Sequence, residues 1–265
     1  GSGAGDEIIV SAGFYDKLYG LAIAGQISGG LSIGAQVVVF NDNARQHAHI
    51  KDGAVLTQAG SGIHVDAMAD RDIDALATGG GLSGGGSIGA AVAVVNVDTA
   101  STRAEVGTVD SAGSDVAIGK VAGKTVGGLS ATATSEADIE VMTVMVAGGL
   151  GFGLGGAVGI VDYRPDITAR IDGDADVDVA NDVIVSTRSV VDVENDAVGV
   201  SLGSAAGLGA AIAISTIKPV MTTTIGSATI NAGNDVRLRS YHNYTVAGDS
   251  VLDHQAYSRA IAGGG

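Results

Sequence analysis

The sequence predicts an all-β fold, and within that class a repetitive β-solenoid with parallel strands. The first observation is that one glycine-rich aliphatic segment occurs four times, which indicates an array of one supersecondary unit. The second is composition: the chain has 43 glycines, 2 prolines and only 3% aromatic residues, so thin layers of small and β-branched side chains are favoured over a bulky core. The third is that no segment shows a sustained helical apolar period with caps, so helix content should be near zero. The four copies are Leu31–Phe40, Gly86–Val95, Gly153–Val161 and Gly207–Ser215.

Each copy lies within a long run that contains no charged residue: Leu18–Asn41, Leu76–Val97, Val144–Val161 and Ala197–Ile217. Runs of this length can span a membrane as helices. However, the second run holds seven glycines, and each costs a helix about 1 kcal/mol relative to alanine. We therefore expect buried β-strands and no membrane insertion.

Shorter alternating segments follow each glycine-rich run, for example Ile167–Ile171, Ala175–Val179 and Asn181–Ser186. The central glycines of the copies (Gly34, Gly89, Gly155 and Gly209) are 55, 66 and 54 residues apart. A period near 54 divides into three coils of about 18 residues, and stacking such coils about 4.8 Å apart predicts a rod roughly 70 Å long. The alternative is antiparallel, with hairpin-linked sheets stacked as a prism or sandwich.

The whole chain is expected to form one continuous array. Residues 1–17 are a lead-in or an artificial leader plus the first strand, and 111–128 are an insertion that should project as a loop. The predicted repeats are 18–75, 76–143 (with the insertion), 144–196 and 197–265, the last with an incomplete end.

Charge and cysteine content exclude several functions. The formal net charge is −15, which argues against binding nucleic acid, because that requires clustered Lys and Arg. The chain has no cysteine, which removes disulfides and Cys-ligated metal sites. No catalytic triad spacing is present either, so the sequence predicts no enzyme and no cofactor.

Two sets of side chains are candidates for binding. Alternating aspartates would share one face of a strand and could form a calcium ladder, although a solvated face that discourages aggregation is favoured. These are Asp172, Asp174, Asp176 and Asp178, and a weaker version of the pattern occurs at Asp70, Asp72 and Asp74. A polar and aromatic cluster is the best candidate for a ligand patch: Arg239, Tyr241, His242 and Tyr244.

His47 and His49 also share a strand face. A zinc site there would need one or two more ligands from a neighbouring coil. A solvated strand face is the favoured interpretation.

The run Ser87–Asn96, together with Gly233–Leu238, resembles the tandem β-strand repeats of very large secreted bacterial adhesins of the leukotoxin-like and filamentous-haemagglutinin-like kinds. The resemblance implies a β-helical stalk in the extracellular space or on the bacterial cell surface, with a structural and adhesive role. Its partners would be neighbouring repeats of the same long chain and a cell-surface glycan or protein receptor. The alternatives are a membrane-active, toxin-like segment and a β-helix that binds or cleaves polysaccharide.

Overall fold

The computed structural model describes residues 6–108, 115–245, 247–251 and 256–265. Every regular element in these residues is a β-strand, so the all-β prediction is confirmed. Among the same residues no helix is long and apolar enough to cross a membrane. The four uncharged runs form strands, as predicted, but their outward-facing side chains, such as Leu82 and Leu202, are exposed, so the expected burial is wrong for one face of these strands.

The described residues form eighteen strands in four sheets. The longest sheet has the order β1-β5-β9-β13-β17, and β18 also pairs with β13; its strands are β1 (Glu7–Ser28), β5 (Gly62–Ser83), β9 (Leu129–Gly149), β13 (Val183–Gly203), β17 (Val236–His242) and β18 (Tyr257–Gly264). The facing sheet contains β2 (Leu31–Asn41), β6 (Gly86–Val97), β10 (Phe152–Tyr163) and β14 (Ala206–Ile217). The third contains β3 (Arg45–Ile50), β7 (Ser101–Val106), β11 (Asp166–Ile171) and β15 (Val220–Ile225), and the fourth β4 (Val55–Leu56), β8 (Ala117–Ile118), β12 (Ala175–Val179) and β16 (Ala228–Ala232).

All pairings between these strands are parallel, which confirms the solenoid and makes the antiparallel alternative wrong. The four sequence copies stack directly on one another, because Gly34 pairs with Gly89, Gly89 with Gly155, and Gly155 with Gly209. In the described residues the one antiparallel contact is an isolated bridge between Tyr244 and Ser250.

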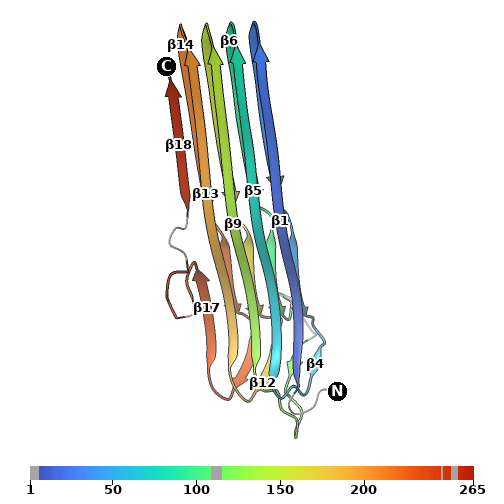
Figure 1. Ribbon diagram of the computed structural model, residues 1–265. Helices are drawn as coiled ribbons and strands as arrows, with labels where there is room; N and C mark the ends of the chain where they lie inside the picture. Colours follow the sequence, from blue (N-terminus) through green and yellow to red (C-terminus); the bar gives the residue numbers. More distant parts are fainter. Residues whose placement is uncertain (1–5, 109–114, 246, 252–255) are drawn as a thin grey trace.

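The coil is much larger than the sequence suggested. Each repeat makes one circuit: a long strand such as β5, a tight turn at Gly84 and Gly85, the return strand β6, and then β7 and β8. The prediction of three 18-residue coils per repeat is therefore wrong. The long axis runs along the strands (Figure 1), since 22 residues span roughly 70 Å whereas five stacked strands rise only roughly 20 Å. The predicted rod of many stacked coils is likewise wrong.

The expected insertion lies in the second circuit, between β7 and the start of β9, and residues 109–114 of that region lie outside the described residues. The rest of it includes β8, which pairs with β4 and β12. Part of the predicted loop therefore contributes a strand to the fourth sheet.

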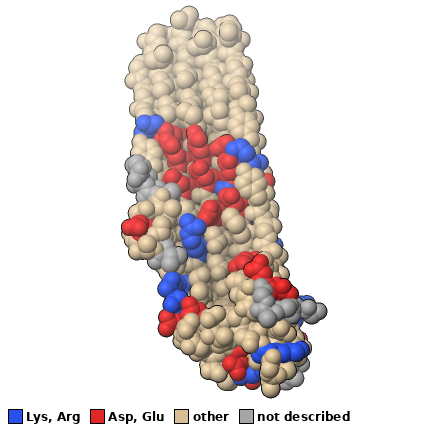
Figure 2. All heavy atoms as spheres, turned by 60° about the horizontal axis from the view of Figure 1, so that its bottom comes forward, with Lys and Arg blue, Asp and Glu red and all other residues tan. Residues whose placement is uncertain are grey.

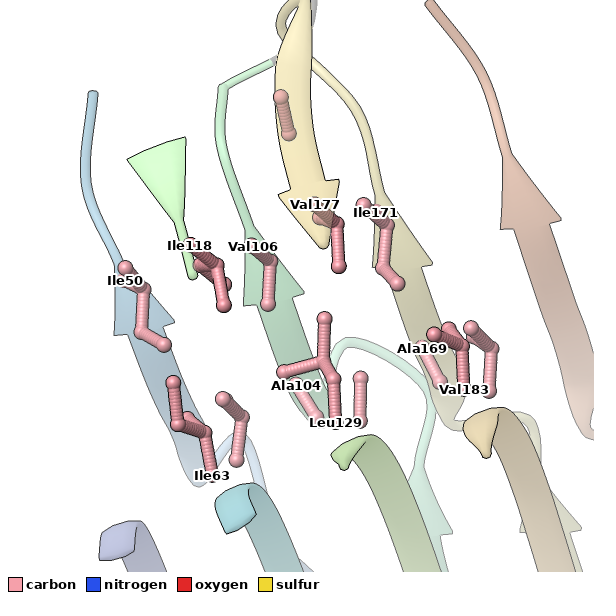
Figure 3. Packing of buried hydrophobic residues seen from close by; sticks show 14 of the residues in the cluster. Ile50, Ile63, Ala104, Val106, Ile118, Leu129, Ala169, Ile171, Val177 and Val183 are labelled. Atoms are coloured by element: carbon pink, nitrogen blue, oxygen red, sulfur yellow. The ribbon is translucent and has the colours of Figure 1, made fainter. Parts of the chain in front are cut away.

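Each coil has two differently built halves. Where the chain starts and ends its circuit, three sheets enclose an aliphatic core that includes Ile63, Val106, Ile118, Leu129 and Ile171 (Figure 3). Further along, only the long sheet and its facing sheet remain, and they enclose a second core. Ile73, Val95, Ile139 and Val161 belong to this second core.

Glycine is required where these two sheets approach each other most closely. A Cβ added to Gly199 would lie 1.9 Å from the carbonyl oxygen of Ala210, and one added to Gly155 would lie 2.8 Å from that of Val200. Both distances are shorter than real Cβ contacts. The close contact is therefore formed between the backbones of the two facing sheets.

Arg71 lies between the two cores and is 1% exposed. Its Nε donates to Asp42, and its Nη1 donates to Ser135 Oγ at 3.2 Å. Ser135 in turn contacts the hydroxyl of Tyr163 at 3.0 Å, and burial raises the pKa of that hydroxyl. This polar cluster closes the corner where β2 ends and the chain turns toward β3.

Candidate functional site

The outer face of the long sheet carries the densest cluster of charged side chains on the described surface. Nine carboxylates occupy alternate positions on three neighbouring strands: Asp70, Asp72, Asp74, Glu136, Asp138, Glu140, Asp192, Glu194 and Asp196. We call this set the acidic grid. Because the strands are parallel and in register, Asp72 pairs with Asp138 and then with Asp192 across the sheet.

Carboxylates at adjacent positions of parallel strands repel one another. The pKa of Asp138 is raised, first by burial and then by the neighbouring charges of Asp192 and Asp72. Burial and the charges of Asp74 and Glu194 likewise raise the pKa of Glu140. The centre of the grid therefore holds carboxylates whose ionised form is disfavoured, and it attracts cations.

In the part of the chain that the structure describes, basic side chains pair with carboxylates at the border of the grid, and no ion pair involves Asp138 or Glu140 at its centre. Lys17 pairs with Asp72, Arg259 with Asp196, and Arg188 Nη1 lies 2.6 Å from Glu136 Oε1. Figure 2 shows acidic side chains gathered at mid-length of this face, with basic ones beside them.

Beyond the grid, toward the end at the top of Figure 1, both sheets consist of the uncharged runs. We call this part the uncharged blade: 75–83, 86–95, 141–161 and 197–215, with 20–40 of the first coil. Its outer surface exposes large aliphatic side chains, with Leu82 57%, Leu150 73% and Leu202 59% exposed. One face of the molecule thus joins a charged zone to an apolar one.

The four predicted calcium ligands do not form a ladder. Asp172 and Asp174 lie in the turn between β11 and β12, and only Asp176 and Asp178 lie on a strand. Asp172 accepts hydrogen bonds from the backbone N–H of Gly173 and Ser227, while Asp176 pairs with Lys120 at 2.8 Å. The expectation of one shared strand face is wrong, because Gly173 and Asp174 adopt positive φ and break the extended chain.

The predicted ligand patch is also divided. In β17, Arg239 and Tyr241 pair with Ser186 and Arg188, so they share the outward parity of the sheet. His242 pairs with the buried Ser189 and turns inward, and burial lowers its pKa. Tyr244 lies beyond the strand, so the four side chains do not face a common ligand.

The sequence indicated only one row of the acidic grid, at Asp70, Asp72 and Asp74. The missing signal was the repeat alignment, because Asp74, Glu140 and Glu194 stand at the same offset before the central glycines. That offset predicts a column of charge once the strands are known to be parallel. Among the described residues, three metal-ligating side chains come close together at one place, outside the grid: His47, His49 and Glu105.

Comparison of the chain with protein-family models, with curated protein sequences and with solved structures gives no significant match.

Proposed function

We propose that this chain is a non-catalytic structural and adhesive segment of a large secreted or surface-exposed bacterial repeat protein. The observation that carries the proposal is the in-register stacking of successive coils in four parallel sheets. Such arrays are stabilised mainly by contacts between neighbouring repeats, so they extend by adding coils and suit a stalk.

The edges of the stack support this role. In the described residues β1 pairs with β5 alone and β2 with β6 alone, so one backbone edge of each strand is open. The aliphatic side chains of this first coil, among them Ile23, Ile33 and Val37, are exposed. An additional coil of the same kind would pair with these edges and pack beside these side chains, which would remain on the outer face of the sheets.

The acidic grid and the uncharged blade supply the adhesive surface in this proposal. A flat face with a fixed charge pattern can bind a basic receptor or a cation-bridged acidic glycan. To test this, the chain is displayed on beads, and bead retention on cultured cells is measured under flow. Asp72→Asn/Asp138→Asn/Asp192→Asn should reduce retention several-fold, and Asp176→Asn/Asp178→Asn is the matched control outside the grid. Retention equal to that of uncoated beads would refute the adhesive role.

A second candidate is a membrane-active, toxin-like segment. The observation that favours it is the uncharged blade, whose exposed leucines could enter an apolar phase. Dye release from liposomes separates the two proposals, because an adhesive stalk leaves vesicles intact. Release that is abolished by Leu82→Asp/Leu202→Asp would favour the membrane-active role.

A further inference from the structure

The outer face of the third sheet brings together three side chains that ligate transition metals. His47 and His49 lie on β3 of the first coil, and Glu105 lies on β7 of the second, where it pairs directly with His49. One ligand atom from each residue lies within 4.8 Å of those of the other two. The neighbouring coil thus provides the third ligand that the pair of histidines requires.

We propose that His47, His49 and Glu105 bind one divalent transition-metal ion, with Zn²⁺ as the best fit, and that the ion links the first two coils. Two imidazoles and one carboxylate form a known zinc ligand set, with water at the fourth position. Calcium and magnesium prefer all-oxygen sites, so the imidazoles discriminate against them.

The geometry needs little adjustment to hold the ion. Zinc–nitrogen and zinc–oxygen bonds of about 2.0–2.1 Å place tetrahedral ligand atoms roughly 3.3 Å apart. His47 Nε2 already lies 2.8 Å from Glu105 Oε2. The two imidazole rings are nearly parallel, with centroids 4.8 Å apart and an interplanar angle of 14°. His47 has a side chain that is 47% exposed, so it can rotate to complete the site.

Hydrogen bonds and ion pairs with neighbouring groups orient the ligands, as is usual in metal sites. In the tautomer with a proton on Nε2, His49 donates to the carbonyl oxygen of Gly107 at 3.1 Å; the Nδ1 lone pair is then available to the metal. The Glu105 side chain is 3% exposed, and Arg170 Nη2 holds its Oε1 at 3.1 Å. When the metal binds, His47 gives up its contact with Glu105, and the neutral ring carries its proton on Nδ1.

Arg170 limits the strength of the site. Its guanidinium lies 3.1 Å from Glu105 Oε1 and adds a positive charge next to the bound cation, which lowers the affinity for the ion.

Zinc titration of the purified chain, followed by competition with a chromophoric zinc indicator, tests the proposal. One equivalent should bind, and His47→Gln, His49→Ala or Glu105→Gln should each weaken binding at least about tenfold. His64→Ala is the matched control, because His64 is a half-buried histidine that contacts Ser130 at 2.8 Å outside the site. Circular dichroism verifies that each variant keeps its strands, and His47→Gln is the substitution least able to disturb folding.

Two further measurements distinguish this site from the acidic grid. Excess calcium should not displace the zinc, and cobalt should give the visible spectrum of a four-coordinate nitrogen and oxygen site. The absence of an equivalent of bound zinc would overturn the proposal. So would binding that persists in His47→Gln and His49→Ala, or that calcium removes.

Discussion

Replacing Gly199 by alanine should destabilise the uncharged blade, although it adds only one methyl group. The added Cβ would lie 1.9 Å from the carbonyl oxygen of Ala210. That oxygen belongs to β14, which is fixed by its pairing with β10. Gly199 is also held on both sides, by Met145 of β9 and Ala262 of β18. The clash can be relieved only by separating the two sheets, and overpacking of this kind costs about 1–3 kcal/mol.

The matched control is Gly80→Ala on the same long sheet. Its Cβ would lie 4.0 Å from the nearest atom, the carbonyl oxygen of Val146. Neither glycine has positive φ, so backbone strain does not distinguish the two. The control should change stability by no more than about 0.5 kcal/mol.

Thermal unfolding monitored by circular dichroism measures both effects. A loss of about 2 kcal/mol should lower the Tm by roughly 4–8 °C in a chain of this size, and hydrogen exchange should increase first in β13 and β14. If both variants shift the Tm equally, or if Gly199→Ala shifts it by less than about 1 °C, the two sheets are not packed backbone against backbone.

Three other outcomes follow from the structure. Asp138→Asn should stabilise the protein by about 0.5 kcal/mol at pH 7. The raised pKa of Asp138 means that the native state binds its proton more tightly than the unfolded state, so the stability of the wild-type protein falls as pH rises from the unfolded to the folded pKa value. Urea midpoints should show that the gain vanishes below about pH 4 and shrinks in high salt, and a loss of stability at pH 7 would contradict the prediction. Arg71→Met should cost about 3–5 kcal/mol in urea unfolding, because it leaves Asp42 as a buried unpaired charge, and adding Asp42→Asn should recover part of the loss; no recovery would show that the ion pair is unimportant. Pulling the chain by its ends should release coils of 54–66 residues, each lengthening the chain by roughly 180–240 Å, whereas steps of about one third that length would restore the smaller coil.

Side-chain spacing along the sequence could place some residues of the candidate sites on a common strand face, but not others. The alternation at Asp70, Asp72 and Asp74 was visible, and period two correctly placed these carboxylates on one face. The same rule failed at Asp172 and Asp174, because an interrupted strand looks identical to a continuous one until the backbone angles are known. His47 and His49 were identified as a pair, but Glu105 lies 56 residues beyond His49 and only the strand register brings it there.

The sequence by itself determined that the protein is a β-strand repeat array, because recurring glycine-rich aliphatic segments with little aromatic content can stabilise one another only as stacked thin layers. It also determined that the four copies are equivalent. The tertiary structure decided that one repeat forms a single long circuit, and which charges become neighbours. Periodicity along the chain specifies which face of the sheet a side chain occupies. Coil length and register depend instead on where two sheets can pack against each other. At Gly199 that packing is a contact with the backbone of Ala210 on the facing sheet, and the local sequence of neither strand specifies it.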